Sequence, residues 1–271
     1  MTKINNPRLL LAQLRKGDFA HPGDKEAIDI VLKKIHELIS ATDLKAGIKA
    51  LDVGSGLGGT AAYIKQKTSF DIEGIEIDKA ANAHAKAKYP GIGFHDCDVM
   101  SVNTLFQKKQ FDLIYLFNVF YAIPDQKICL KQLAAVAKPG ALMVIFDYTL
   151  CSPEHIPSSP HAFSGDLQDD KFNMKDLADK PMHLVNLQDL KDWLPATGWN
   201  LIEIVDLTSE YKRWYEDFLK LMMTHKDSLL KTFTEQSFTK VYETFSALLN
   251  ALKTKKISGS IIYAKLSVLS S

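Results

Sequence analysis

The chain has 271 residues, of which 46% are hydrophobic and 24% are charged, and its formal net charge is +1. This is the composition of a globular protein with an ample core. The near-neutral net charge argues against nucleic acid or an anionic membrane surface as a partner. No apolar run approaches the roughly 18 residues of a membrane span. The three cysteines are scattered without metal-ligand spacing, which indicates a reduced, cytoplasmic setting and no metal site.

Residues 24 to 148 alternate helical patterns with short apolar runs. Asp24–Ile39 has the apolar spacing of an amphipathic helix. Further helices are predicted near 58–67, 79–89 and 124–137, and buried strands at Ala50–Val53, Asp71–Ile77, Ile92–His95, Phe111–Phe117 and Ala141–Phe146. Strands that alternate with helices predict an α/β fold with a doubly wound sheet.

After Tyr148 this alternation stops. Residues 151–180 are rich in proline, serine, aspartate and lysine and are predicted to form a lid loop. A short helix, a strand, two amphipathic helices and a last strand follow, at Leu187–Leu194, Trp199–Leu207, 209–231, 235–253 and Ser260–Val268. We therefore expect a single domain over 1–271, with a core at 17–148 and a helical cap at 209–253 between strands six and seven. The apolar face of the cap covers a substrate or another subunit, so a monomer and a homodimer both stay open.

A glycine-rich stretch, LDVGSGLGG, occupies residues 51–59, between the first predicted strand and the following helix. Gly54, Gly56 and Gly59 satisfy the spacing G-x-G-x-x-G of a nucleotide-binding turn. Glycines let the backbone take left-handed dihedral angles and let a ligand approach without a Cβ atom in its path. Several folds share this spacing, so a tight turn without a ligand is the alternative interpretation.

Three carboxylates stand at strand ends near this turn. Glu76 closes the second strand, 20 residues after Gly56, where an acidic side chain can accept both hydroxyl protons of a ribose. Asp98 follows the third strand and can accept from an adenine amino group or cap the next short helix. Asp52 precedes the glycines and would repel a pyrophosphate, so it favours a ligand with a cationic amino-acid end over a dinucleotide.

LDVGSGLGG, GIEID, FHDCD and FDLIYLFNVF follow one another in order, and together they resemble the successive motifs of class I S-adenosylmethionine-dependent methyltransferases. The resemblance covers about residues 17–148. It implies a Rossmann-like, seven-stranded sheet with an antiparallel last strand, S-adenosylmethionine as cofactor and S-adenosylhomocysteine as product. DVGSGLGG, VIFDYT and the helices before the last strand are most similar to the small-molecule branch of the phosphoethanolamine N-methyltransferases. The segment 16–24 matches the loop that covers the cofactor in that branch.

The resemblance also implies roles for single residues. The cofactor-binding set comprises the turn, the three strand-end carboxylates, the residue stacked on adenine and the residue facing the methyl group: Asp52, Gly54, Ser55, Gly56, Glu76, Ile77, Asp98 and Asn118. The histidine that this branch places near the methyl group corresponds to Ala122 here. The phosphate-binding arginine and tyrosine of its lid correspond to Lys180 and Met182.

We expect methyl transfer to a small-molecule acceptor, with amines among the candidates. His21 in the covering loop, Tyr121 and Tyr148 are the candidate catalytic residues, and aromatic faces could hold a methylated ammonium group. Two alternatives stay open, a nucleotide-cofactor oxidoreductase and a cofactor-binding protein without catalysis. Methylation of nucleic acid is disfavoured, because no basic strip is visible and residues 118–121 read NVFY.

Overall fold

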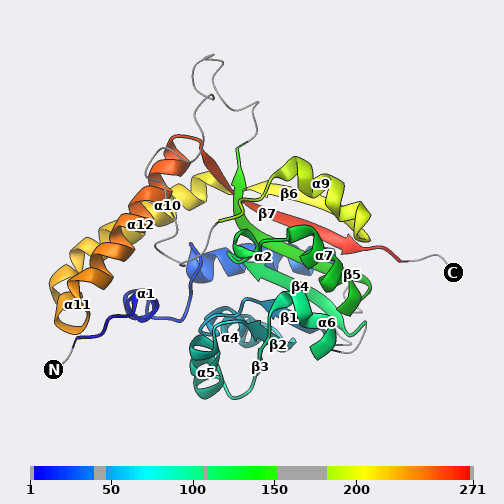
Figure 1. Ribbon diagram of the computed structural model, residues 1–271, viewed down its shortest axis with the longest axis horizontal. Coiled ribbons are helices and arrows are strands. Elements are labelled where there is room, and N and C mark those ends of the chain that lie inside the picture. Colours follow the sequence, from blue (N-terminus) through cyan, green and yellow to red (C-terminus); the bar gives the residue numbers. More distant parts are fainter. Residues whose placement is uncertain (1–2, 40–46, 107–108, 152–181, 269–271) are drawn as a thin grey trace, which may run out of the picture.

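A computed structural model describes residues 3–39, 47–106, 109–151 and 182–268. Its centre is a seven-stranded sheet in the order β3-β2-β1-β4-β5-β7-β6 (Figure 1). The strands are β1 (Lys49–Val53), β2 (Asp71–Glu76), β3 (Gly93–Asp96), β4 (Phe111–Phe117), β5 (Ala137–Leu150), β6 (Trp199–Asp206) and β7 (Ile257–Leu266). Strands β1 to β5 pair in parallel, and β7 is antiparallel to both β5 and β6. This confirms the predicted doubly wound sheet with an antiparallel last strand.

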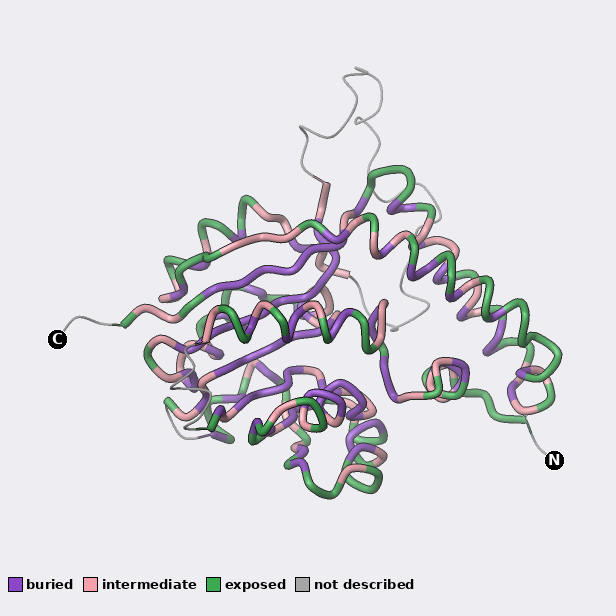
Figure 2. The backbone as a smooth tube through the Cα atoms, turned by 180° about the vertical axis from the view of Figure 1, so that it is seen from behind, coloured by how far each residue is buried: buried purple, intermediate pink, exposed green. Residues whose placement is uncertain are grey.

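Helices cover both faces of the sheet and create two hydrophobic cores. Residues of α2 (Asp24–Leu38), α4 (Gly59–Lys67) and α5 (Lys79–Lys88) belong to the first core. The second core contains residues of η1 (Val99–Ser101), α6 (Val102–Leu105), η2 (Phe120–Ala122), α7 (Gln126–Val136) and α9 (Leu187–Ala196). Figure 2 shows long buried stretches along β1, β4, β5 and β7, whereas most of β6, at the edge of the sheet, is exposed or partly buried. None of the helices described has the length and apolar character needed to cross a membrane.

The helices between β6 and β7 project to one side of the sheet (Figure 1). They are α10 (Thr208–Thr224), α11 (Lys226–Thr232) and α12 (Glu235–Lys253), so the stretch predicted as one helix at 209–231 is two helices that meet at His225. Their apolar faces extend the first core, where Tyr211, Trp214 and Phe245 are buried. The helices thus lie between β6 and β7 in the chain, as expected for the cap. That they cover a substrate stays a proposal.

The helix at the start of the chain was not expected from the sequence. Helix α1 (Pro7–Arg15) begins with Pro7 in its first turn and with Asn6 as its N-cap, a combination typical of helix starts. Its apolar face contacts α12, and Ile4 hydrogen-bonds with Thr232 and Thr234 of the cap. The N-terminal segment is therefore anchored to the cap rather than to the sheet. The expected lid loop at 151–180 lies almost entirely outside the described residues.

Candidate functional site

The predicted site residues come together at the carboxyl edge of β1, β2, β4 and β5. In open α/β sheets, ligands bind outside this edge, because the turns that leave neighbouring strands diverge there. The glycine turn leaves β1, Glu76 ends β2, Asn118 follows β4 and Tyr148 lies near the end of β5. The sheet therefore supplies one continuous rim for all of them.

Backbone conformation explains the glycines of the turn after β1. Gly54, Gly56 and Gly58 have φ angles of +72°, +54° and +86°, which glycine adopts at little cost. A Cβ on Gly59 would lie 2.5 Å from the carbonyl oxygen of Asp18 in the covering loop, so this glycine permits close packing of two backbone segments. A Cβ on Gly56 would meet nothing within 4 Å. Gly56 therefore faces open space rather than protein.

Glu76 is oriented by the same turn. Its Oε2 accepts the backbone N–H of Gly56 at 2.9 Å, and its Oε1 accepts the N–H of Asp78 at 2.8 Å. The side chain is fixed but not saturated, because a carboxylate has about four acceptor positions. It can therefore accept further hydrogen bonds from the hydroxyl groups of a ligand that lies against Gly56.

Asp52 is a buried carboxyl group with an unsatisfied oxygen. The residue is 2% exposed, and its Oδ2 has no hydrogen-bond partner among the described residues. Burial raises its pKa to about 8, and the nearby negative charge of Glu76 adds to the rise. Such a group is stabilised in its charged form by a cation. The site thus offers a position for a positive charge next to the turn.

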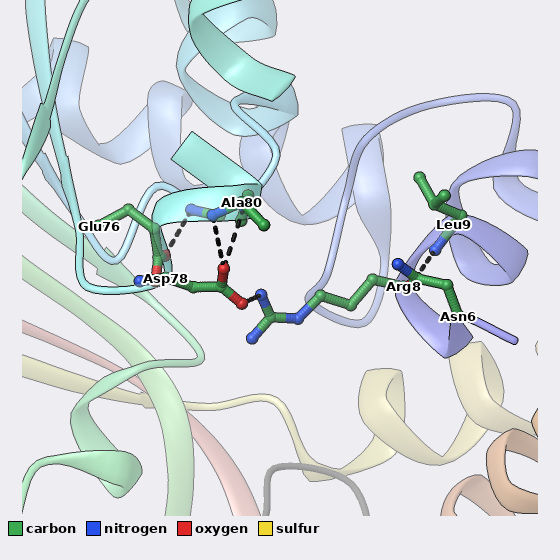
Figure 3. A network of polar contacts seen from close by, with 8 residues as sticks. Asn6, Arg8, Leu9, Glu76, Asp78 and Ala80 are labelled. Carbon is green, nitrogen blue, oxygen red and sulfur yellow. Dashed lines mark hydrogen bonds and ion pairs between the residues drawn. The ribbon is translucent and has the colours of Figure 1, made fainter. Parts of the chain in front are cut away.

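The segments that follow β2 and β3 present an exposed apolar side chain and two helix-capping aspartates. Ile77 is 56% exposed although it is large and apolar. Figure 3 shows the polar contacts of the next residue: Asp78 caps α5 through the N–H of Ala80, and Arg8 of α1 forms an ion pair with Asp78. Asp98 is exposed and accepts the N–H of Met100 as the N-cap of η1. This contact fits the capping interpretation and leaves the adenine role of Asp98 as a proposal.

Asn118 begins the turn that leaves β4. It is a non-glycine residue with a φ of +51°, a strained conformation that occurs preferentially at functional sites. Its Oδ1 accepts the Tyr211 hydroxyl at 3.4 Å, whereas its buried Nδ2 has no partner within the described part of the chain. An unused donor thus stands at the rim between the glycine turn and the cap.

Aromatic side chains cluster beyond Asn118. The rings of Tyr121 and Tyr148 lie 5.7 Å apart, those of Tyr148 and Tyr211 lie 5.6 Å apart, and the Tyr148 hydroxyl contacts that of Tyr215. Burial raises the pKa of Tyr121 to about 12 and that of Tyr148 well above its ordinary value. These hydroxyls are therefore neutral near neutral pH and can donate hydrogen bonds.

His21 holds the covering loop against the glycine turn. It is 1% exposed, its Nδ1 contacts the carbonyl oxygen of Pro22, and its Nε2 contacts the Thr60 hydroxyl of α4 at 3.1 Å. Nδ1 must carry the proton to donate to a carbonyl, so Nε2 accepts from Thr60. Burial lowers the pKa of His21 to about 3. The imidazole is therefore neutral and engaged on both nitrogens, and the catalytic role expected for it stays a prediction.

Arg15, which sequence reasoning did not identify, anchors this loop from the other side. Its guanidinium group donates to the carbonyl oxygen of His21 and to Asp24, and it lies 4.8 Å from the ring centre of Phe218. Its side chain is 4% exposed. No local motif marks an arginine for this role, since its partners lie on three separate elements.

These features fit an S-adenosyl ligand. The unpaired carboxyl of Asp52 suits an amino-acid ammonium group, Glu76 suits ribose hydroxyls and the exposed Ile77 suits an adenine ring. Gly56 leaves the room that such a ligand needs. The donor set therefore agrees with the resemblance.

Comparison with known proteins gives the same assignment. Residues 24–204 match the model of the family described as "Methyltransferase domain". The phosphoethanolamine N-methyltransferase of Plasmodium falciparum is 24% identical over 229 residues, which are 83% of this chain and 80% of that protein. Phosphoethanolamine N-methyltransferase 1 of Triticum aestivum is 27% identical over 79% of this chain but only 40% of its own length.

A solved structure has a similar fold. Phosphoethanolamine N-methyltransferase 2 of Haemonchus contortus, in complex with phosphomonomethylethanolamine and S-adenosylhomocysteine, superimposes with a TM-score of 0.78 and 17% identity. The match covers 96% of this chain and 56% of that chain. The family match decides against the oxidoreductase alternative. The chain belongs to the methyltransferase domain family, as a class I S-adenosylmethionine-dependent methyltransferase.

Proposed function

We propose that the protein transfers the methyl group of S-adenosylmethionine to a small-molecule acceptor that carries an amine. The observation that carries this proposal is the continuity of the rim: Asp52 and Glu76 flank the glycine turn, and Asn118 joins this turn to the tyrosine cluster. A cofactor and an acceptor bound at one rim can bring sulfonium and nucleophile into line. The similarity to phosphoethanolamine N-methyltransferases supports the amine.

The cofactor would be held by residues of three strand ends. In the proposal, Gly54, Ser55 and Gly56 line its methionine end, and Asp52 carries the charge opposite its ammonium group. Glu76 accepts from the ribose, Ile77 packs on the adenine and Asp98 accepts from the adenine amino group. The bound sulfonium supplies a methyl group that is already activated for displacement. The protein's own residues need only align the acceptor, exclude water and, for some acceptors, take up a proton.

The aromatic cluster suits the acceptor. In the proposal, ring faces of Tyr121, Tyr148 and Trp214 attract an ammonium group of the acceptor, and the Asn118 Nδ2 donates to an oxygen of the acceptor. The high pKa values of the two tyrosines exclude tyrosinate as the base near neutral pH. An acceptor that binds as an ammonium ion must first release one proton to water, and the neutral amine then attacks with its free lone pair and needs no further base. We therefore assign orientation of the acceptor to Tyr121 and Tyr148.

A panel assay tests the proposal. S-adenosylhomocysteine formation would be measured with phosphoethanolamine, ethanolamine, sarcosine and a phenol as acceptors, and calorimetry would measure binding of S-adenosylhomocysteine. We expect tight cofactor binding and turnover of at least one amine. Binding without turnover of any compound would favour the cofactor-binding protein without catalysis, an alternative kept open by Ala122. Turnover of the phenol alone would contradict an amine acceptor.

The proposal extends to the setting and assembly of the protein. The three cysteines that the structure describes are free thiols, which suits a cytoplasmic location. For the oligomeric state, a monomer and a homodimer both stay predictions. We also propose that residues 209–253 form a cap over the acceptor. Sedimentation measures the first, and turnover by cap variants measures the second.

Replacing Glu76 by alanine should weaken S-adenosylhomocysteine binding by about 1.5–3 kcal/mol, or roughly 10- to 150-fold, the range for hydrogen bonds to a charged group. Glu73→Ala is the matched control, because Glu73 lies on the same strand but pairs with His95. Calorimetry of both variants measures the difference. Equal losses in the two variants would mean that Glu76 serves only the strand and not the ribose.

Tyr148→Phe should lower the turnover of the best amine about tenfold, the effect of one hydrogen bond, while S-adenosylhomocysteine affinity stays within about threefold. The substitution removes only the hydroxyl that contacts Tyr215. Tyr263→Phe, in a buried tyrosine of β7, controls for the loss of a buried hydroxyl in general. Unchanged turnover in Tyr148→Phe would make Tyr148 a packing residue.

A further inference from the structure

Asp147 is a buried carboxyl group that the proposed function does not use. It lies near the end of β5, is fully buried and forms no ion pair with any residue that the structure describes. An uncompensated buried carboxylate is costly, so its retention calls for hydrogen bonds to the charged form or for a task.

The hydrogen-bond partners of Asp147 are backbone N–H groups. Its Oδ2 accepts the N–H of Tyr121 at 3.1 Å, and its Oδ1 accepts the N–H of Tyr148 at 2.7 Å. Side chains alternate across a strand. Consequently the carboxylate lies on the side of η2, and the Tyr148 ring lies on the side of the cap, where it contacts Tyr211. One residue pair thus connects the turn after β4 with the aromatic cluster.

The turn of residues 118–122 also hydrogen-bonds with Phe146, Gln126, His183 and Tyr211. The Asn118 N–H donates to the carbonyl oxygen of Phe146, and the Gln126 side chain donates to that of Phe120 at 3.0 Å. His183 donates its backbone N–H to the carbonyl oxygen of Tyr121. Because Asn118 is held at a positive φ, the surroundings must fix the conformation of this turn. Among the residues that the structure describes, Asp147 is the side chain that accepts a hydrogen bond from a backbone N–H of this turn, that of Tyr121.

We propose that Asp147 is a positioning residue whose ionised carboxylate holds the turn of residues 118–122 and thereby fixes the side chains of Asn118 and Tyr121. The importance of these two side chains rests on the proposed function, whereas the holding of the turn does not. An ionised carboxyl accepts through both oxygens, and a protonated one turns one oxygen into a donor. Protonation should therefore loosen the contact with one of the two N–H groups.

Titration of this group falls near neutral pH. Burial raises the pKa of Asp147 to about 7, and its backbone hydrogen bonds oppose the rise. A turn that opens while Asp147 stays buried loses these bonds and binds the proton more tightly, so the held turn is favoured as the pH rises through about 7. Global unfolding, which exposes the carboxyl group to water, has the opposite pH dependence. The titratable groups around it are tyrosines: Tyr121 on η2, Tyr148 on its own strand, and Tyr211 and Tyr215 on α10, all with raised pKa values. They stay neutral in this range. His183 contacts the turn through its backbone and is the histidine to be controlled.

Amide hydrogen exchange of the full chain tests the proposal without an acceptor. Exchange at Phe120 and Tyr121 would be followed from about pH 5.5 to about pH 8.5, with intrinsic rates divided out. In the native chain we expect protection to rise as the pH passes about 7. In Asp147→Asn, protection above that pH should be at least tenfold lower, and it should no longer depend on pH. His183→Gln should keep both the protection and its pH dependence. Asp125→Asn is the matched control, because Asp125 caps α7 through the N–H of Ile128.

A second measurement separates positioning from general structure. S-adenosylhomocysteine affinity of Asp147→Asn should stay within about threefold by calorimetry, while kcat for phosphoethanolamine, or for the fastest acceptor of the panel, falls at least tenfold. Protection within twofold of the native chain in Asp147→Asn overturns the proposal. If this variant does not fold, the native protein decides: protection of the turn that does not change with pH would overturn the proposal. Failure of the acceptor panel would affect only the kcat readout and would leave the exchange result decisive.

Discussion

Gly56→Val should weaken the binding of S-adenosylhomocysteine at least about 100-fold, which corresponds to about 2.7 kcal/mol. A Cβ at this position would meet no protein atom within 4 Å, so the branched side chain would occupy the space beside Glu76 that the ligand needs. The N–H of Gly56 donates to the Glu76 carboxylate, so the added side chain would stand next to that carboxylate. Calorimetry with S-adenosylhomocysteine measures the loss.

Backbone strain must be separated from this obstruction. Gly56 has a φ of +54°, and a β-branched residue in this region costs roughly 1–2 kcal/mol. Gly47→Val is the matched control: Gly47 has a φ of +92°, nothing lies within 4 Å of its Cβ position, and it precedes β1 at the opposite edge of the sheet. Both variants should lose stability, and only Gly56→Val should lose binding. If Gly56→Val bound S-adenosylhomocysteine normally, the glycines would serve only to turn the chain and not to admit the ligand.

Most of the fold could be predicted because its signals are local. The strand at Phe111–Phe117 and the helix at 235–253 coincide with β4 and α12. Each has an apolar periodicity that a single type of structure satisfies. The break at His225 was missed, since no glycine or proline marks it and packing of two helices on the cap decides where the helix ends. Helix α1 was missed although Asn6 and Pro7 are good start signals, because its apolar face has meaning only against α12.

Part of the candidate site could likewise be predicted from the sequence, and part could not. Strand ends and glycine spacing predicted where Asp52, Gly56 and Glu76 would meet, because parallel strands deliver their carboxyl ends to one edge. Contacts between distant elements could not be predicted. The Thr60 partner of His21 and the N–H groups around Asp147 depend on tertiary structure that no local pattern records.

Acidification should weaken cofactor binding through Asp52. The free protein holds a proton on this carboxyl up to a pKa of about 8, whereas a cofactor ammonium group opposite the carboxylate would require the charged form. Binding must then release the proton, so S-adenosylhomocysteine affinity should fall about tenfold per pH unit below pH 8. Calorimetry in buffers of different ionisation enthalpy measures both the affinity and the proton released.

The sign of the stability effect follows from the same pKa. Folding raises the pKa of Asp52 from 3.8 to about 8, so the folded state binds the proton more tightly than the unfolded state. Its contribution to the free energy of unfolding is therefore largest below about pH 4 and is lost as the pH rises through about 8. Asp52→Asn should accordingly raise the melting temperature of the free protein at pH 8 while it weakens cofactor binding.

Asp52→Asn also isolates this carboxyl from the ligand's own titration. The α-amino group of the cofactor loses its proton near pH 8, but this loss affects native and variant proteins alike. The ratio of the native affinity to that of Asp52→Asn should therefore fall about tenfold per pH unit from pH 8 to about pH 6. Glu76→Gln removes a negative charge that helps to raise the pKa of Asp52, so in that background the same decline should begin at a lower pH. A ratio that is constant with pH would show that Asp52 does not carry the charge opposite the cofactor, and the ammonium group would have to be held by backbone carbonyls of the turn alone.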